Sequence, residues 1–406
     1  MPSPAVYRRR RQVFFGGVAI VLSFLLYMLV TGLAPLPTAV GSLAPVADLT
    51  SPQAQLALPG VGANALSADG YGSLGTSGTQ DQLPMASIAK TITALVVLEA
   101  KPLNGADDQG PNITFTEDDV AILNQTQAEM GSYEVVTAGM VLTEKQALTT
   151  MMLASANNYA VSLANWAYGS VDKYVEAANA WAQAHHLAAT HISDPAGIDA
   201  GTSASPADLI SIGEMAMSND ALASIVGTKV ADIPGVGEVS NGNKLLGHYG
   251  VNGIKTGTTT EAGACLLYSS VVPVGNSFVH LTGVSLGFDS HAELRDSVGA
   301  LLMSAQAGFH EVPIVTEGQE WGTVTTSWGQ TSSIKAASSL TDVVWSNTAV
   351  SVTPSLHEFS TGEAGAVIGK LVVVIGETTQ EIPLVLESAL SDPGLGWRMS
   401  HAGELF

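Results

Sequence analysis

Ser87 and Lys90 stand three residues apart at the start of an apolar run, PMASIAKTITALVVLEA, residues 84–100. On a helix, positions i and i+3 share a face with Cβ atoms about 5–6 Å apart, so the lysine amine can reach the serine oxygen. An apolar surround disfavours the ammonium form and lowers the lysine pKa, which makes the amine a base for the hydroxyl. A helix N-terminus also offers free backbone N–H groups to an oxyanion. The pair therefore predicts a serine nucleophile activated by lysine.

The Ser-x-x-Lys spacing alone is not specific, because it occurs three times in the chain. Ser170 and Lys173 stand between a glycine and an acidic stretch, which predicts a solvated lysine. Ser332 and Lys335 fall in a β-rich tail, where residues three apart do not share a face. Only the pair at Ser87 begins a helix that is predicted to be buried.

Two further motifs follow in chain order. Ser155-Ala156-Asn157 is the only Ser-x-Asn in the sequence, and it lies in a predicted loop between helices. Lys255-Thr256-Gly257 is the only Lys-Thr-Gly, and it lies on a predicted strand. The three motifs bring a nucleophile, two amines and an amide into one candidate set.

This ordered triple resembles the signature of the penicillin-recognising serine enzymes, in which the three elements line one cleft. The flanking stretches resemble the low-molecular-mass penicillin-binding proteins that act as serine-type D-alanyl-D-alanine carboxypeptidases. The resemblance covers roughly residues 55–310 and extends more loosely to WRMSH near the end, which resembles the close of a β-rich domain. It is carried by PMASIAKTITALVVLE, LASANNYAVSLAN, DPAGID, NGNKLLGHYGVNGIKTG and TTTEAGACL.

The resemblance implies a mechanism. Ser87 would attack the carbonyl of the penultimate D-alanine of a peptidoglycan stem peptide, with Lys90 as the base, and the terminal D-alanine would leave. Ser155 would relay a proton to the leaving amine, and Asn157 would hold the substrate amide and Lys90. Water would hydrolyse the acyl-enzyme, and β-lactam antibiotics would act as covalent inhibitors.

The matching strand residues receive binding roles from the same resemblance. Lys255 would complete the positive field, and Thr256 would help to bind the terminal carboxylate of the substrate. Gly257 would let the strand approach the substrate closely, because no Cβ intervenes. The backbone N–H groups of Ser87 and Thr258 would form the oxyanion hole.

Two positions depart from the family pattern. Several relatives carry an arginine after Lys-Thr-Gly that clamps the substrate carboxylate, but residues 262–294 hold no arginine or lysine, only His280 and His291. Asn158 follows Asn157 where many relatives have aspartate, which would change the loop electrostatics but not the mechanism.

The same residues leave other activities open. A peptidoglycan endopeptidase or transpeptidase would use the same site, and a β-lactamase would need a base for rapid deacylation. A non-catalytic cell-wall scaffolding protein is a further alternative, but it has no reason to keep Ser87, Lys90, Asn157 and Lys255 together. We expect a D-alanyl-D-alanine carboxypeptidase.

The N-terminal region has the pattern of a membrane anchor. Four arginines at 8–11 precede residues 13–34, 22 positions without a charge, which as a helix would span about 33 Å against about 30 Å of hydrocarbon. Arginines on the cytoplasmic side would place the later residues on the extracytoplasmic side of the cytoplasmic membrane. Pro35 and Pro37 follow in place of a small-residue cleavage site, so a single-pass signal anchor is preferred to a cleaved signal peptide.

Periodicity in the central region predicts alternating strand and helix segments. Residues 53–80 have the pattern of a β-hairpin, and a helix begins near Ser87. Thr143 and Gln146 fit a capping box. Further helices are predicted up to Gly169, over 171–187 and over 291–309, and strands are predicted around Lys255, at 264–272 and at 278–287.

This order predicts an α+β fold in which one antiparallel sheet is flanked by helices. The resemblance makes it a β-lactamase/transpeptidase-like catalytic domain followed by a small all-β domain. The predicted boundaries are a basic tail and transmembrane helix at 1–34, a linker at 35–52, a catalytic domain at 53–310 and a β-rich domain at 311–406. An irregular first strand is the alternative to the linker.

Composition excludes several classes of function. The chain has only 15 basic residues, and four of them are the N-terminal arginines. The rest of the chain therefore holds 11 basic against 36 acidic residues, and this excess of negative charge repels nucleic acid. A single cysteine, Cys265, allows no internal disulfide and is predicted to be a small buried hydrophobe. His185 and His186 have no suitably spaced carboxylate or thiolate partner, so we expect no metal site and no cofactor.

Overall fold

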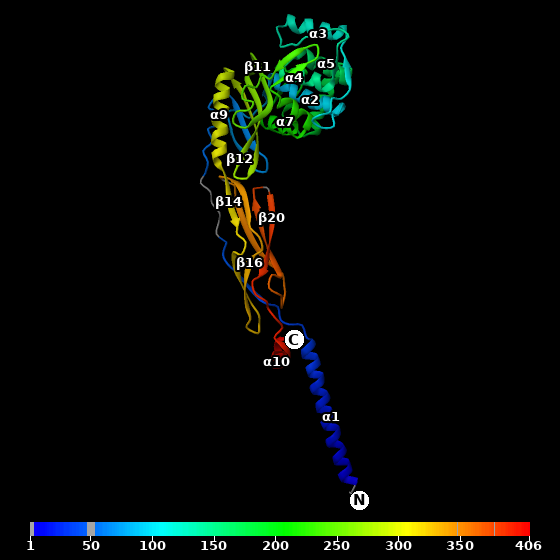
Figure 1. Ribbon diagram of the computed structural model, residues 1–406, viewed down its shortest axis with the longest axis vertical. Helices are drawn as coiled ribbons and strands as arrows, with labels where there is room; N and C mark the ends of the chain where they lie inside the picture. Colours follow the sequence, from blue (N-terminus) through cyan, green and yellow to red (C-terminus); the bar gives the residue numbers. More distant parts are fainter. Residues whose placement is uncertain (1–3, 47–52, 347, 377) are drawn as a thin grey trace. The chain divides into compact units, whose positions relative to one another are not determined.

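The computed structural model describes residues 4–46, 53–346, 348–376 and 378–406 (Figure 1). Contacts divide these residues into two units. One comprises 53–310 with Trp345 and Ser346, and the other comprises 4–46, 311–344 and the described residues from 348 onward. Residues 47–52 of the predicted linker lie outside the described residues.

A five-stranded antiparallel sheet, in the order β11-β12-β13-β2-β3, forms the frame of the 53–310 unit. The predicted hairpin and the three strands predicted around and after Lys255 are all present. Strand β12, which lies between β11 and β13, is buried along most of its length, since helices cover both faces of the sheet (Figure 1). The bounds are β2 (Ala63–Ala68), β3 (Gly72–Ser77), β11 (Val251–Thr259), β12 (Gly263–Val274) and β13 (Ser277–Phe288).

Helix α9 (His291–Gly308) packs on β12 and β13, and α7 (Pro206–Ser218) packs on β2, β11, β12 and β13. The remaining helices of this unit are η1 (Ala86–Ile88), α2 (Ala89–Ala100), α3 (Glu117–Ala128), α4 (Glu144–Leu153), α5 (Asn157–Tyr168), α6 (Val171–Ala184) and α8 (Asp220–Val226). Short paired strands connect them: β4 (Leu83–Pro84), β5 (Asn112–Thr114), β6 (Val141–Thr143), β7 (Thr190–His191), β8 (Ser203–Ala204), β9 (Val230–Ile233) and β10 (Gly237–Ser240).

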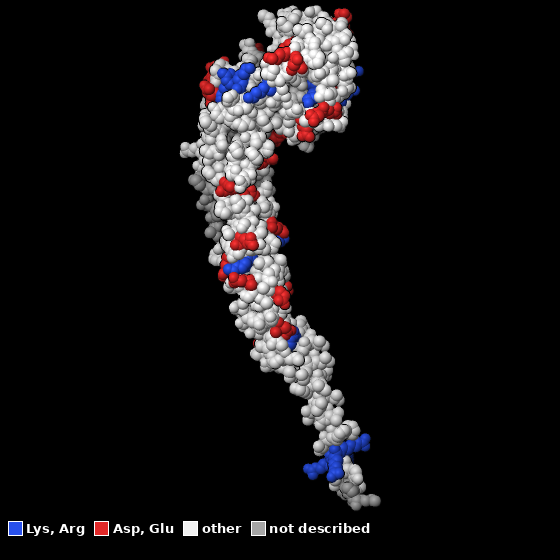
Figure 2. Space-filling view, in the orientation of Figure 1, with Lys and Arg blue, Asp and Glu red and all other residues white. Residues whose placement is uncertain are grey.

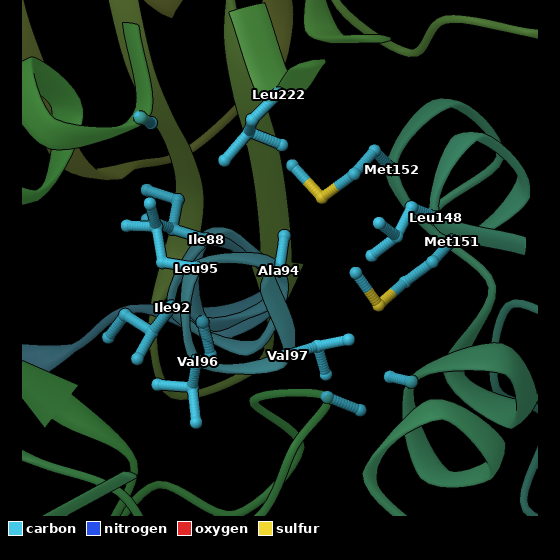
Figure 3. Packing of buried hydrophobic residues seen from close by; sticks show 14 of the residues in the cluster. Ile88, Ile92, Ala94, Leu95, Val96, Val97, Leu148, Met151, Met152 and Leu222 are labelled. Atoms are coloured by element: carbon cyan, nitrogen blue, oxygen red, sulfur yellow. The ribbon is translucent and has the colours of Figure 1, made fainter. Parts of the chain in front are cut away.

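Helix α2 lies at the centre of the helical group. Every residue from Ala89 to Leu98 is buried, which is the pattern of a helix surrounded by protein on all sides. Figure 3 shows its aliphatic side chains beside Met151 and Met152 of α4 and Leu222 of α8. Burial of each such side chain stabilises the fold by roughly 1.5–3 kcal/mol. This core fixes the helix that carries Lys90.

Two helix boundaries differ from the predictions. Ser87 lies in the 3₁₀ turn η1, and the α-helix begins two residues later at Ala89. The helix predicted over 171–187 ends at Ala184, because His186 adopts a left-handed conformation with φ +59° that terminates a helix. The other signals agree with the structure: the capping box of Thr143 and Gln146 is formed at α4, and α5 ends before a left-handed Gly169.

The second unit contains a six-stranded antiparallel sheet in the order β1-β15-β16-β20-β19-β18. Its core is formed by aliphatic residues and Trp321. The bounds of its strands are β1 (Val40–Leu43), β15 (Glu320–Thr325), β16 (Thr331–Ala336), β18 (Val350–Leu356), β19 (Val367–Ile375) and β20 (Thr378–Leu386). Strands β14 (Phe309–Val315) and β17 (Leu340–Trp345) pair with each other in a separate two-stranded sheet.

The structure corrects the sequence analysis at both ends of this unit. Strand β1 falls within the stretch predicted to be a linker and pairs with β15, because its backbone groups complete an edge of the sheet. A short helix that the sequence analysis did not anticipate, α10 (Gly394–Ser400), follows the strands and leads into η2 (Ala402–Glu404). Arg398 of α10 pairs with Asp392 and donates to the Ala34 carbonyl.

Helix α1 (Pro4–Leu33) is the one helix in the described part of the chain that is long and apolar enough to cross a bilayer. Its most apolar window has a mean hydropathy of 2.5. Figure 2 shows a cluster of basic side chains near the start of α1, and acidic side chains scattered over the visible face of the later residues.

Glu144, the first residue of α4, carries a stability cost that depends on pH. Its side chain is fully buried, and neither carboxylate oxygen has a hydrogen-bond partner among the described residues. Burial, and then the charge of Asp108, raise the pKa of Glu144 from 4.5 to about 7. The folded state therefore binds the proton more tightly than the unfolded state, and the free energy of unfolding falls as pH rises between about 4.5 and 7.

Glu144→Gln should remove this loss, since the amide stays neutral at every pH. The expected gain is small at pH 5 and on the order of 3 kcal/mol at pH 8, because each pKa unit corresponds to about 1.4 kcal/mol. The measurement is the melting temperature of the detergent-solubilised chain at both pH values, with the exposed Glu117→Gln as a control. An equal gain at pH 5 and pH 8 would contradict the assignment.

Candidate active site

Ser87 and Lys90 meet as their spacing predicts. Ser87 is the central, half-buried residue of η1, and Lys90 is the second residue of α2. Lys90 Nζ lies 2.8 Å from Ser87 Oγ and donates to the Ala196 carbonyl at 2.9 Å. A neutral amine in this position can give an N–H to the carbonyl while its lone pair accepts the Ser87 hydroxyl proton.

The surroundings of Lys90 favour the neutral amine. Its side chain is fully buried. Burial holds the pKa of Lys90 well below its usual value, and the positive charge of Lys255 lowers that pKa further, while Asp194 acts in the opposite direction. The neutral form is the one that can remove a proton from a serine hydroxyl.

Lys255 supplies a second amine from strand β11. Its side chain is 3% exposed, and Nζ donates to the Thr256 carbonyl at 3.1 Å. Burial lowers the pKa of Lys255 to about 7. Throughout the described ranges Lys255 has no ion-pair partner. Its charge is therefore available to an anion that enters from outside.

Strand β11 passes directly against the nucleophile. A Cβ on Gly257 would lie 2.9 Å from the Ser87 backbone nitrogen and 3.0 Å from the Met85 carbonyl oxygen, so glycine permits this approach. One residue earlier, Thr256 Oγ1 lies close to Gly242, which donates to the Leu153 carbonyl just before the Ser155 loop. The strand thus connects the nucleophile with that loop.

Thr258 contacts a residue that the sequence analysis did not place in the site. Its hydroxyl donates to the Gly257 carbonyl at 2.8 Å and lies 2.6 Å from His291 Nε2 at the start of α9. Burial, and then the positive charges of Arg295 and Lys255, lower the pKa of His291. No local pattern indicated this contact between residues 33 positions apart.

The carbonyl that accepts from Lys90 belongs to a loop built around Asp194. This carboxylate accepts five hydrogen bonds, which fix the loop, from the backbone N–H groups of Ala196, Gly197, Ile198 and Asp199 and the hydroxyl of Thr202. Thr93 of α2 secures it further by donating to the Pro195 carbonyl at 2.7 Å. The stretch DPAGID was part of the resemblance alone, and its Asp-Pro-x-Gly turn signal is the local feature that could have predicted this loop.

The backbone beside Ser87 is confined on its other side by Gly197. That glycine has φ +73°, and a Cβ on it would lie 1.9 Å from the Ala86 carbonyl oxygen. Ala86 itself has φ +48°, a conformation that costs a non-glycine residue roughly 1–2 kcal/mol. Such conformations cluster at functional sites, where the surrounding structure enforces them.

Ser155 and Asn157 lie where α5 begins. Ser155 also adopts a left-handed conformation, with φ +57°. Asn157 Nδ2 would lie 2.7 Å from a Cβ on Gly131, and Asn157 Oδ1 is buried without a hydrogen-bond partner in the described ranges. Within these ranges neither Ser155 nor Asn157 forms a side-chain hydrogen bond to Lys90, so the contact of Asn157 with Lys90 that the resemblance implied is not formed.

Asn158 has a structural partner that explains an amide at this position. Its Oδ1 accepts from the Glu134 backbone N–H at 3.2 Å, and its Nδ2 donates to the Glu134 carbonyl at 2.9 Å. An aspartate would replace the Nδ2 donor with a second oxygen, which would face the Glu134 carbonyl as one acceptor against another. The amide therefore suits the loop that packs beside Asn157.

The other candidate groups have structural roles. Ser170 caps α6 by accepting from the Lys173 backbone N–H, and Lys335 on β16 pairs with Glu320 and Glu387. Burial raises the pKa of the Cys265 thiol to about 11. The part of the chain that the structure describes contains no group of three or more potential metal ligands.

Comparison with known proteins gives matches to one family. The family model described as D-alanyl-D-alanine carboxypeptidase, peptidase S11, matches residues 74–279. The D-alanyl-D-alanine carboxypeptidase DacF of Bacillus subtilis is 25% identical over 248 residues, which are 59% of this chain and 60% of that protein. The chain thus matches about three fifths of the length of this curated relative.

Solved structures confirm the fold class. Penicillin-binding protein 5 from Haemophilus influenzae matches 85% of this chain and 100% of its own, with a TM-score of 0.56 at 20% identity. The Streptomyces K15 DD-transpeptidase matches 63% of this chain and 98% of its own, with a TM-score of 0.53 at 25% identity. Since the family model covers half of the chain, including the three motifs at Ser87, Ser155 and Lys255, the chain belongs to the D-alanyl-D-alanine carboxypeptidase family, peptidase S11.

Proposed function

We propose that this protein is a serine-type D-alanyl-D-alanine carboxypeptidase that removes the terminal D-alanine from peptidoglycan stem peptides. The observation that carries the proposal is the 2.8 Å separation between Ser87 Oγ and a buried Lys90 amine. Membership of the family and the likeness to DacF support this reaction class.

Acylation begins with proton transfer from Ser87 to the neutral Lys90 amine. The Ser87 oxygen then forms a bond to the carbonyl carbon of the penultimate D-alanine. When the tetrahedral intermediate collapses, its C–N bond breaks, and the proton that Lys90 took from Ser87 passes through Ser155 to the amine of the leaving D-alanine. Water then attacks the ester and gives a proton to Lys90. As the ester bond breaks, that proton returns to Ser87 Oγ and the shortened peptide leaves. A β-lactam would acylate the same hydroxyl and stay bound.

Substrate binding follows the charges and free groups around Ser87. Lys255 attracts the terminal carboxylate because no internal carboxylate in the described ranges neutralises it, and Thr256 helps to hold that carboxylate. Asn157 Oδ1 is a buried acceptor without a partner, which suits a substrate amide N–H. The backbone N–H groups of Ser87 and Thr258 form the oxyanion hole.

The proposal includes anchoring in the cytoplasmic membrane. Helix α1 supplies one apolar span with four arginines near its start. Arginines are retained on the cytoplasmic side, so the residues after α1 lie on the extracytoplasmic side, where peptidoglycan is found.

Ser87→Ala should abolish covalent labelling by a fluorescent penicillin and release of D-alanine from a pentapeptide, because no other hydroxyl among the described residues hydrogen-bonds to Lys90 Nζ. Labelling is read from a denaturing gel. Ser170→Ala, which alters a serine of the same Ser-x-x-Lys spacing that only caps a helix, should be labelled like the wild type. Wild-type labelling of the Ser87→Ala protein would reject the assignment.

Asp194→Asn should slow acylation by penicillin roughly tenfold or more, because the loss of charged hydrogen bonds loosens the carbonyl that holds Lys90. The matched control is Asp208→Asn, since the Asp208 carboxylate accepts its hydrogen bonds from Ala189 and Thr190 in a neighbouring turn. Stopped-flow acylation rates and melting temperatures are measured for both. Equal losses of rate in the two variants would show that Asp194 acts only through stability.

The pH dependence of acylation should have an alkaline limb set by Lys255. Its pKa of about 7 makes it a cation below that pH and a neutral amine above it, so affinity for a substrate carboxylate falls as pH rises through about 7. Lys255→Arg keeps the charge and should move this limb to higher pH, although the overall rate falls. The measurement is the second-order rate constant for penicillin acylation between pH 5.5 and 9.5. An unmoved alkaline limb in the variant would exclude Lys255 as its source.

A further inference from the structure

Arg295, in the second turn of helix α9, has a guanidinium group without a partner. Only two arginines follow the four at the start of the chain, and the other one, Arg398, is held by Asp392 and the Ala34 carbonyl. Arg295 is partly buried and forms no ion pair or hydrogen bond within the described ranges. A guanidinium presents five N–H donors in a planar fork that matches a carboxylate. The mechanism above gives this group no role.

Helix α9 begins beside the end of strand β11. Nε2 of His291, the first residue of α9, lies 2.6 Å from Oγ1 of Thr258, which follows the Lys-Thr-Gly motif directly. Arg295 comes four residues after His291, so the two residues share a face of the helix. Long side chains on a helix lean towards its N-terminus, and that of Arg295 therefore extends back over the turn that holds His291. Helix geometry thus brings the guanidinium to the edge of the active site at Thr258.

The electrostatics of His291 indicate the same proximity. Burial lowers the pKa of His291, and the positive charges of Arg295 and then Lys255 lower that pKa further. The effect of one charge on another falls with distance and with screening by solvent. Arg295 and Lys255 therefore contribute to one positive field around the imidazole.

The acidic residues of α9 leave this field in place. Glu293 and Asp296 are exposed, and neither forms an ion pair with Arg295 in the described part of the chain. They stand two residues before and one residue after Arg295, and residues at these spacings do not face each other on a helix. The positive charge stays available to an anion that enters from outside.

Strand β11 offers hydroxyl groups to the same anion. Thr256 and Thr258 are two residues apart on the strand, so their side chains lie on one of its faces. Thr256 is partly buried and Thr258 is exposed. Between them and the reactive pair, the Lys255 amine donates to the Thr256 carbonyl. A carboxylate on this face meets hydroxyl donors from the strand and a cation on each side.

We propose that Arg295 is a substrate-binding residue that holds the free carboxylate of the substrate from the α9 side, while Lys255 and Thr256 hold it from β11. This inference rests on the proposed function. His291 is a positioning residue, because its contact with Thr258 keeps the start of α9 against the strand. A substrate whose carboxylate is masked, as in an internal peptide bond, loses the contacts with both cations. Arg295 thereby favours cleavage at a free chain end.

The two cations differ in their dependence on pH. Lys255 loses its charge as pH rises through about 7, because burial lowers its pKa to about 7. A guanidinium stays charged at every pH at which a protein is folded. Binding of the carboxylate above pH 7 therefore depends mainly on Arg295.

The test compares benzylpenicillin with its methyl ester, which has the same reactive ring and lacks the free carboxylate. Mass spectrometry of quenched samples gives the second-order rate constant for acylation of the detergent-solubilised full chain by each compound. Arg295→Gln should lower the rate constant for benzylpenicillin about tenfold, the effect of one lost charged hydrogen bond, and leave that for the ester unchanged. Arg295→Lys keeps the charge without the fork and should recover part of the loss.

Two comparisons separate substrate binding from a structural role. The loss in Arg295→Gln should be larger at pH 9 than at pH 6, because Lys255 is neutral at the higher pH. Lys173→Gln removes an exposed cation from α6 and should keep the wild-type ratio of the two rate constants at both pH values. A ratio that Arg295→Gln leaves unchanged, including an equal loss with both compounds, overturns the inference.

Release of D-alanine from a pentapeptide separates the two levels of failure. If the wild type releases D-alanine and is labelled by penicillin, but the ratio does not depend on Arg295, only this inference fails. If the wild type is neither labelled nor releases D-alanine, the proposed carboxypeptidase fails and this inference fails with it.

Discussion

The amine of Lys90 is fully buried, and no carboxylate pairs with it in the described part of the chain. A charged amine in that environment would be strongly unfavourable, so the neutral form is stabilised relative to the ammonium. The neutral amine still needs a hydrogen-bond acceptor, and Ala196 supplies it. The five hydrogen bonds that Asp194 accepts fix the loop that holds this carbonyl beside Lys90.

Close packing of backbone keeps the nucleophile in place. Gly257 of β11 approaches the Ser87 nitrogen on one side, and Gly197 of the Asp194 loop approaches the Ala86 carbonyl on the other. A Cβ at either glycine would clash with backbone atoms, which cannot move aside as a flexible side chain would. Ala86 accepts an unfavourable φ between them. The site is thereby arranged before a substrate binds, so little ordering remains when acylation begins.

Local signals predicted much of the fold because they depend on neighbouring residues. The capping box at Thr143 follows from hydrogen bonds within one helical turn. Strand β11 and its partners follow from the alternation of apolar and polar residues and from the turns between the strands. A linker was preferred to a strand at residues 40–43, because this strand is stabilised by pairing with β15, which lies nearly 300 residues later in the sequence. The end of α6 was misplaced, since a left-handed His186 has no sequence rule as strong as that for glycine.

The sequence by itself determined the reactive pair, because Ser87 and Lys90 stand one turn apart at the start of an apolar helical run and the two later motifs distinguish them from the other Ser-x-x-Lys pairs. It also determined the apolar span near the arginines, which depends only on length and composition. Tertiary structure decided which carbonyl holds Lys90, how close Gly257 comes to Ser87 and that His291 contacts Thr258, because each joins residues from separate elements. Tertiary structure also decided the pKa values of the Lys90 and Lys255 amines, since burial is the main cause of both shifts and only the packed chain creates burial.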